Sequence, residues 1–239
     1  MAVINGKIPA SSLTKLSTPG GLLKAAAASF ERLNKEATMT VGTTNALQAY
    51  RSLVQQRILF FENYDRTYRA GRTVANGGKK LYQGVWYYRK DGKAVAAVPG
   101  TSNHGLGVAV DWQGLDGYGT KDFIAFARLA NKHGWNNTEG RKTGEYWHWV
   151  YVEANDRVLA QIKAAAAAKA AARLKMKKIQ GYLGVPQTGD PDTRTLSAFN
   201  KCPNGLTMKR IQRVLGVDDD GIKGPLTKAA WAKLCKAAK

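Results

Sequence analysis

The stretch Ser102-Asn-His104-Gly-Leu-Gly-Val-Ala-Val-Asp111, with Glu145-Tyr-Trp-His148-Trp149 further along, is the part of the chain from which its fold and chemistry follow most directly. It holds two of the three histidines in the sequence. Two neutral imidazoles and one carboxylate suit a zinc ion, because they fill three tetrahedral positions and leave the fourth open for water. We therefore predict that His104, Asp111 and His148 bind zinc.

The same stretch contains a candidate for proton transfer. A zinc centre with one anionic ligand keeps a net positive charge, which lowers the pKa of a bound water and polarises a carbonyl group. A further carboxylate must accept the proton of that water, and Glu145, three residues before His148, is the candidate. Because the two residues are an odd number apart, a flat strand would point them to opposite faces. Glu145 therefore either precedes the strand or belongs to a bulge.

Each histidine also has a plainer interpretation when it is taken by itself. On spacing alone, His104 is equally a loop histidine that caps local backbone, and His148 a half-buried strand histidine among aromatic residues. His133 follows a predicted helix, where a cation complements the helix dipole, and we assign it a structural role.

The elements around these motifs alternate between the two kinds of secondary structure. Residues 20–37, 44–57 and 121–133 have the composition and spacing of helices, and residues 108–112 and 144–152 those of strands. Residues 81–98 alternate aromatic and polar positions around Asp91-Gly92, which predicts a hairpin. Helices and antiparallel strands in this order predict an α+β domain with a small antiparallel sheet.

Residues 157–178 change the composition abruptly, because most of them are Ala, Lys or Arg. These residue types are strong helix formers. Their apolar positions are too uniform for a defined core face, so we predict a helix that closes the first domain and continues as a spacer over residues 160–172. The predicted domains are residues 1–165 and residues 173–239.

The second domain contains an internal repeat with a period of 32 residues. Residues 174–185 align without a gap on residues 206–217, and Phe199 corresponds to Trp231. Each copy has apolar residues spaced three and four apart, then a glycine-bearing loop and a second helix. One copy is too small to bury a core, so we predict a small all-α domain in which the two copies pack together.

These motifs resemble those of the D-alanyl-D-alanine metallopeptidases (the LAS family), which include VanX and VanY dipeptidases and carboxypeptidases and many phage endolysins. The resemblance spans residues 40–155 and rests on three separated elements in the right order. They are Ser-x-His-x-x-Gly-x-Ala-x-Asp at 102–111, Glu-x-x-His-Trp at 145–149, and Tyr-Arg-Ser-x-x-Gln at 50–55.

The resemblance implies a role for each motif residue. It implies that zinc is held by His104, Asp111 and His148, and that Glu145 is the general acid and base. It also implies that Arg51, on an upstream helix, contacts the scissile carbonyl, and that Ser102 and Gln55 help to hold substrate.

The C-terminal repeats resemble the peptidoglycan-binding-domain-1 modules of wall hydrolases. The second copy, with Gly224-Pro225, is the closer match, whereas the first has Asp192-Thr193 at those positions. Together the two resemblances imply a bacteriolytic zinc peptidase, a phage endolysin that cuts peptidoglycan as an L-alanyl-D-glutamate or D-alanyl endopeptidase. A D-alanyl-D-alanine carboxypeptidase of wall metabolism and a non-catalytic zinc-containing wall-binding protein remain as alternatives.

The chain carries a net charge of +20, divided evenly between residues 1–150 and 151–239. Such a charge favours anionic partners, among which are anionic wall polymers. Nucleic acid is not predicted, because the aromatic residues gather beside the metal motif and not among the basic ones. We predict a monomer without a membrane span. The first residues lack the features of a secretory signal, so we expect synthesis in the host cytoplasm and release to the wall. Cys202 and Cys235 are predicted to be free thiols, with a disulfide as the alternative.

Overall fold

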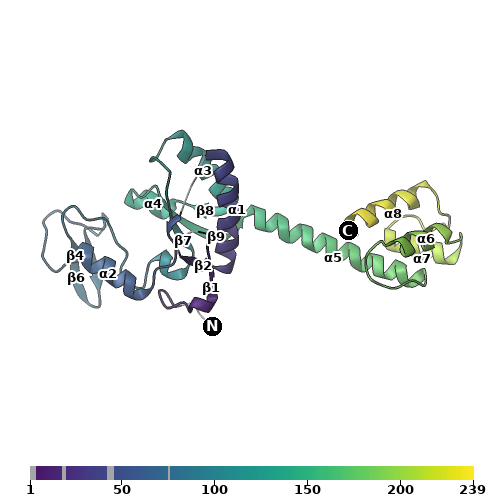
Figure 1. The fold of residues 1–239 in the computed structure, drawn as a ribbon, viewed down its shortest axis with the longest axis horizontal. Helices are drawn as coiled ribbons and strands as arrows, with labels where there is room; N and C mark the ends of the chain where they lie inside the picture. The colour runs from purple at the N-terminus through teal and green to yellow at the C-terminus, as the bar shows by residue number, and fades with distance from the viewer. Residues whose placement is uncertain (1–3, 18–19, 42–45, 75) are drawn as a thin grey trace. The chain divides into compact units, whose positions relative to one another are not determined.

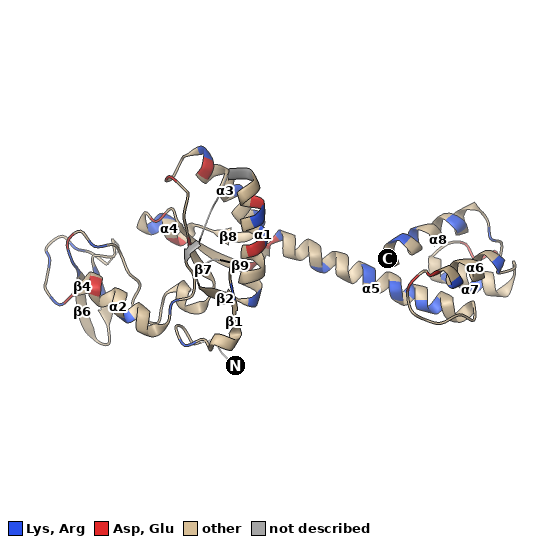
Figure 2. Cartoon of the chain, in the orientation of Figure 1, with Lys and Arg blue, Asp and Glu red and all other residues tan. Residues whose placement is uncertain are grey.

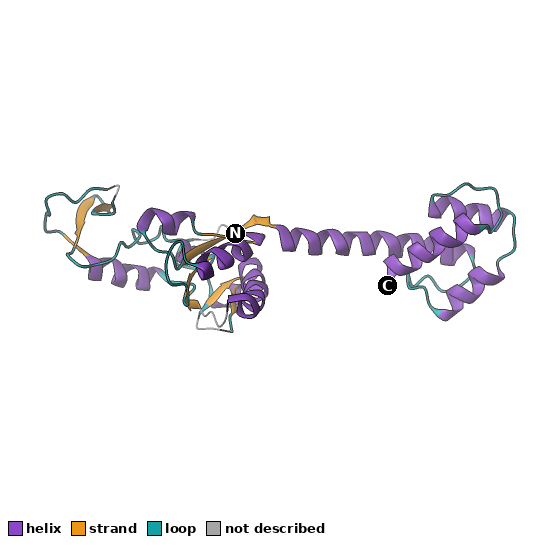
Figure 3. Cartoon of the chain, turned by 90° about the horizontal axis from the view of Figure 1, so that it is seen from above, coloured by secondary structure: helices purple, strands orange, loops and turns teal. Residues whose placement is uncertain are grey.

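The computed structural model describes residues 4–17, 20–41, 46–74 and 76–239. The chain divides into two compact units, Met1–Leu159 and Ala160–Lys239. The first unit mixes helices and strands, and the second consists of helices and loops (Figures 1 and 3). The prediction of an α+β fold followed by a helical region is confirmed. None of the helices in the described ranges is both long and apolar enough to cross a membrane.

A four-stranded antiparallel sheet forms the centre of the first unit. Its strands lie in the order β3-β7-β9-β8, and helices α1 and α3 pack against it. Six large aromatic side chains of the described residues are fully buried in the core that the helices and the sheet form. They are Phe30, Trp112, Phe123, Phe126, Trp135 and Trp149. The bounds are β3 Ala46–Gln48, β7 Ala109–Trp112, β8 His133–Asn136, β9 His148–Asp156, α1 Lys24–Val41 and α3 Lys121–Lys132.

A second layer of the same unit has its own small core. Helix α2 packs with a three-stranded antiparallel sheet of order β4-β6-β5, and we call residues 53–98 the aromatic lobe. Phe60, Tyr64 and Tyr87 are buried together, with the Phe60 and Tyr64 rings stacked 4.9 Å apart. The bounds are α2 Leu53–Asn63, β4 Tyr64–Asp65, β5 Lys79–Tyr82 and β6 Val85–Arg89.

Two local predictions in this region are wrong. The helix predicted over 44–57 begins only at Leu53, because Ser52 and Gln55 form a capping box there. Residues 46–48 are strand β3, and residues 44–45 lie outside the described residues. The hairpin turns at Gln83 and Gly84, not at Asp91-Gly92, with φ values of 50° and 77°. Both angles lie in the left-handed region, as a tight two-residue hairpin turn requires.

Short elements connect these layers. Strands β1 Leu13–Lys15 and β2 Gly21–Leu23 pair with each other. The one-turn helices η1 Ala10–Ser12 and η2 Asn103–Leu106, and the short helix α4 Thr138–Thr143, complete the first unit. The bounds predicted for the strand at 144–152 are wrong, since β9 begins at His148 and ends at Asp156.

Helix α5 Arg157–Tyr182 contains the Ala/Lys-rich segment. Asp156 accepts a hydrogen bond of 2.8 Å from the backbone nitrogen of Leu159 and so caps the start of the helix. Every residue from 160 to 171 is exposed. From Ala172 onward, the helix contributes Met176 and Ile179 to the core of the second unit.

The same hydrogen-bond arrangement around a buried glutamine occurs in both repeats of the second unit. Gln180 in α5 and Gln212 in α7 are buried, and each donates to the threonine that lies in the first turn of the next helix, at 2.9 and 3.0 Å. Each also accepts a 2.8 Å hydrogen bond from a loop glycine nitrogen. The remaining helices are α6 Thr193–Lys201, α7 Leu206–Leu215 and α8 Pro225–Ala238.

The two repeats meet through equivalent side chains. The rings of Phe199 and Trp231 stack with their centroids 4.2 Å apart. Lys223 of the second repeat donates to the carbonyl oxygens of Phe199, Asn200 and Cys202, at the end of the α6 helix of the first. Cys202 and Cys235 are free thiols in this core.

Candidate active site

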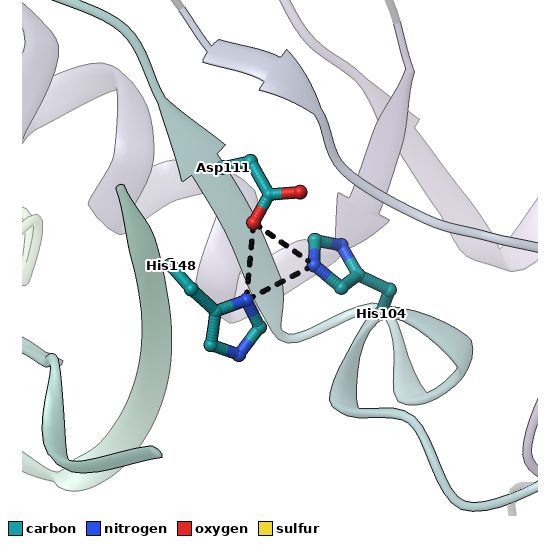
Figure 4. A group of neighbouring side chains, drawn as sticks. All are labelled: His104, Asp111 and His148. Atoms are coloured by element: carbon teal, nitrogen blue, oxygen red, sulfur yellow. Dashed lines mark hydrogen bonds and ion pairs between the residues drawn. The ribbon is translucent and has the colours of Figure 1, made fainter. Parts of the chain in front are cut away.

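Three polar side chains from separate elements meet at one point of the first unit (Figure 4). His104 Nε2 lies 3.2 Å from His148 Nδ1, and Oδ1 of Asp111 lies 3.3 Å from the first nitrogen and 3.0 Å from the second. Bonds of about 2.0–2.1 Å to a tetrahedral zinc ion would separate the ligand atoms by about 3.3–3.4 Å. The three residues therefore fit zinc in both chemistry and spacing.

Strand pairing and a tight turn bring these ligands together. Antiparallel pairing places Asp111 of β7 opposite His148 of β9. His104 lies on η2, which ends at Gly107 with a φ of 65°. A Cβ atom added at Gly107 would lie 3.3 Å from the backbone nitrogen of Leu23, in addition to straining the left-handed backbone. The glycine therefore lets η2 turn directly into β7 and keeps His104 beside Asp111.

The ring nitrogens that face away from the cluster have partners of their own. His104 Nδ1 lies 2.7 Å from the carbonyl oxygen of Ala49, and His148 Nε2 lies 3.1 Å from Oε2 of Glu139. Both partners are acceptors, so each outer nitrogen of a neutral ring carries the proton and donates. The lone pair of the inner nitrogen is then left for a metal ion.

Glu139 is a site residue that the sequence patterns do not reveal. It lies in the first turn of α4, nine residues before His148, and also accepts a 2.6 Å hydrogen bond from Asn103 Nδ2. An acid in the first turn of a helix is common, so its position carries no signal of a metal site. The close approach of α4 to the start of β9 depends on Gly140, where a Cβ atom would lie 2.2 Å from the carbonyl oxygen of Glu145.

The charges around the cluster favour a cation at its centre. The hydrogen bond with His148 is the main cause that lowers the pKa of Glu139 to about 2. Burial alone would raise the pKa of Asp111, but hydrogen bonds with both imidazoles hold it below its usual range. Burial alone would lower the pKa of His148, yet Asp111 and Glu139 raise it to about 9. The carboxylates of Asp111 and Glu139 thus stabilise a positive charge at this position. A metal ion and protons compete for the same ligand atoms.

Glu145 lies in the turn before β9, which answers the question raised by its spacing. The strand begins at His148, so the alternation of faces does not apply to Glu145. Thr143 Oγ1 donates a 2.7 Å hydrogen bond to Glu145 Oε2 and holds the side chain. Glu145 is half-buried, lines the same cavity as the cluster, and is not one of its three members.

Arg51 enters the cavity from a different direction. It lies in the loop that precedes α2, not on the helix as predicted. Its Nη2 atom lies 3.8 Å from Oδ2 of Asp111 and is hydrogen-bonded to Gln48 Oε1. Its backbone nitrogen donates to the carbonyl oxygen of His104 at 3.2 Å, so the loop is fastened to η2. Burial lowers the pKa of Arg51, and the charges of Asp111 and Glu145 oppose this.

The other predicted residues lie in different surroundings. Ser102 is buried, lines the cavity, and its hydroxyl accepts a 3.3 Å hydrogen bond from the backbone nitrogen of His104. Gln55 is engaged in the capping box with Ser52 and lines a neighbouring hollow, not this cavity. Its contact with substrate stays a prediction. His133 is buried at the end of α3, where Nε2 lies 2.8 Å from Glu36.

The cavity has a volume of about 380 Å³, and two parts of the first unit contribute to its lining. One part contains the metal cluster, Glu139 and Glu145. The other is the aromatic lobe, from which come Leu59, Asn63, Lys80 and the segment 94–98, which contains no strand or helix.

Comparison with known protein families identifies the part of the chain that carries this site. The family model described as VanY, D-alanyl-D-alanine carboxypeptidase, matches residues 21–154. This span includes Arg51, the three cluster residues and Glu145. A search of curated proteins found no match.

Similar solved structures cover about two thirds of the chain. One is the vancomycin resistance D,D-pentapeptidase VanY from the VanB-type cassette with Zn(II), at 22% identity, 66% of this chain, 91% of that chain and a TM-score of 0.43. Another is the LdcB LD-carboxypeptidase, at 20% identity, 67% of this chain, 80% of that chain and a TM-score of 0.43.

Proposed function

The chain belongs to the VanY family of D-alanyl-D-alanine carboxypeptidases, and from this premise we propose that it hydrolyses stem-peptide bonds of bacterial peptidoglycan at a zinc ion bound by His104, Asp111 and His148. One observation carries the proposal. The three ligand atoms lie 3.0–3.3 Å apart in a cavity that also contains a carboxylate and a guanidinium not used as ligands.

Each residue of the cavity has a distinct part in this reaction. Bound zinc supplies a Lewis acid that lowers the pKa of water and polarises the scissile carbonyl. Glu145 accepts a proton from the attacking water and returns it to the leaving amine. Arg51 faces the carbonyl oxygen as it gains negative charge and stabilises it. His104 and His148 are held in position by the acceptors behind them, Ala49 and Glu139.

The finer proposal is a lytic enzyme, a phage endolysin that reaches the wall from the host cytoplasm. It cuts within the stem peptide, at the L-alanyl-D-glutamate or a D-alanyl bond, since only cleavage within cross-linked chains releases the wall. Trimming of a terminal D-alanine by a carboxypeptidase is the alternative. The presence of a second unit built from two repeats supports the lytic role, because a wall anchor raises the local concentration of an insoluble substrate.

Mass spectrometry of muropeptides released from purified walls tests the activity and identifies the bond. We expect new amino and carboxyl ends at one stem-peptide bond, and zinc in stoichiometric amount in the purified protein. The matched control is Glu145→Gln, which keeps the size of the side chain and should lose nearly all release. Unaltered muropeptides with the zinc-loaded wild-type protein would refute the proposal.

The anchoring role needs its own experiment. The inactive Glu145→Gln protein should be retained on insoluble walls in about 0.5 M salt, where exposed charge attraction is screened. Residues 1–165 carrying the same substitution should be released. Lys and Arg are spread over both units (Figure 2), so binding at low salt alone does not distinguish them. Equal retention of both proteins at high salt would exclude the second unit as the anchor.

A further inference from the structure

Lys80 is the one residue of strand β5 that lines the catalytic cavity. In the β5–β6 pair it lies opposite Tyr87, so it shares the sheet face that packs onto Phe60 of α2. This face leaves the lysine half-buried. The side chain is therefore presented to the cavity by two paired strands, and not by a free loop.

Its ammonium group has no partner among the residues that the structure describes. No carboxylate there lies within 4.0 Å, and no acceptor forms a hydrogen bond with it. Three other cations of the lobe differ in this respect. Arg69 and Arg72 form ion pairs of 2.6 Å with Asp65 and Asp91. Lys90 donates to the carbonyl oxygen of Phe61 at 2.8 Å.

The carboxylate that acts on Lys80 electrostatically is already engaged elsewhere. Burial lowers the pKa of Lys80, and Glu139 across the cavity opposes this. Glu139, however, already accepts hydrogen bonds from His148 and Asn103. A half-buried cation without a protein partner costs free energy unless a ligand supplies the anion. The cavity thus offers a prepared position for a negatively charged group of the substrate.

Two of the candidate substrates share such a group at one place. In D-alanyl-D-alanine the residue after the scissile bond ends in a free α-carboxylate. At the L-alanyl-D-glutamate bond the same position is also free, because the glutamate continues through its side-chain carboxyl group. An ordinary protein chain has no charge there, since that carboxyl group forms the next peptide bond.

We propose that Lys80 binds the free α-carboxylate of the residue that follows the scissile bond and so determines specificity for stem peptides. The inference rests on the proposed peptidase activity. It explains how one site accepts either bond and rejects ordinary polypeptide. A hydrogen bond to a charged group is worth a change of roughly tenfold to a hundredfold in binding.

The test compares two synthetic stem peptides that differ only in this group, one with the α-carboxylate and one with a carboxamide. The bond is the one that muropeptide analysis identifies. We expect the wild type to favour the acid by at least about tenfold in kcat/KM, mostly through KM. Lys80→Met should lose this preference. Lys93→Met, an exposed lysine of the same lobe, should keep it.

The outcomes separate the two proposals. If the wild type cleaves acid and amide equally, the peptidase stands and the role of Lys80 is overturned. An unchanged preference in Lys80→Met overturns it as well. If the zinc-loaded wild type cleaves neither peptide, the proposed function itself fails. Should Lys80→Met lose all activity, Lys80→Arg decides, because it keeps the charge. Retained preference for the acid supports the role, and loss of preference or of all cleavage overturns it.

Discussion

The motif histidines of the first unit and the repeated glutamines of the second are all buried but are used in opposite ways. His104, Asp111 and His148 point lone pairs at one another across 3.0–3.3 Å. Gln180 and Gln212 have both a donor and an acceptor partner within their own repeat. Buried polar side chains therefore indicate a metal site where their acceptor atoms face one another and need a cation. They indicate a structural role where every donor and acceptor has a partner within the same repeat.

The sharpest test of this comparison is Glu145→Gln. We expect kcat on a soluble stem peptide to fall by about 10²–10⁴-fold, because the amide cannot accept the proton of the attacking water. Zinc content should stay the same, since Glu145 is not a member of the cluster. Metal analysis and peptide hydrolysis on the same preparation check both. Loss of zinc would show that Glu145 is a ligand.

Arg51→Lys tests the second non-ligand of the cavity. Lysine keeps the charge but lacks the planar fork of donors. We expect kcat to fall by about 10²–10³-fold with zinc retained, as for the loss of one oxyanion donor. Steady-state kinetics separates the possibilities. A change confined to KM would assign Arg51 to substrate anchoring, and would contradict a role at the developing charge.

Glu139→Ala tests whether the partner behind His148 belongs to the metal site. We expect zinc affinity to fall by about 10–100-fold, because the imidazole loses the acceptor that fixes its orientation and tautomer. Competition with a chelator measures the affinity. Glu62→Ala, an exposed glutamate of α2, is the matched control and should bind zinc as the wild type does. Equal affinity in both variants would make Glu139 a surface residue without influence on the metal.

For Gln212→Ala in the second unit we expect the opposite result, a loss of stability without a loss of activity. It leaves the nitrogen of Gly221 and the hydroxyl of Thr227 without their buried partner, so we expect the unit to lose about 1–3 kcal/mol of stability. Hydrolysis of a soluble peptide should not change. Denaturation followed by circular dichroism, with exposed Gln187→Ala as control, measures the effect. A loss of peptidase activity with unchanged stability would show that Gln212 contributes to the chemistry and not only to folding, which contradicts the comparison.

The metal cluster could be predicted because two histidines and an aspartate occur in motifs whose residue types, spacing and order together resemble those of a zinc peptidase family. The α+β class followed from the order of periodic segments, and the repeat from direct alignment. Glu139 and Lys80 could not be predicted. Each reaches the cavity through tertiary packing, one on a short helix held by Gly140 and the other on a strand pressed onto α2. Neither packing leaves a spacing rule in the sequence.

The local errors have equally physical causes. Residues 44–57 contain good helix formers, but Ser52 and Gln55 together provide a start signal at 52–53 that overrides the preceding residues. The hairpin turns at Gln83-Gly84, where the glutamine adopts a left-handed φ of 50°. Asparagine and aspartate adopt this conformation more readily than glutamine does. Asp91-Gly92 is therefore the stronger turn signal in the sequence, although it lies after β6.

The stacking of Phe199 on Trp231 and the three hydrogen bonds of Lys223 make the folding of each repeat depend on the other. Each repeat completes the other, so a gene fragment that encodes only one copy would yield a helix pair with an exposed aromatic face and uncapped carbonyl groups. The two repeats are therefore the smallest part of this region that we expect to fold after transfer to another protein.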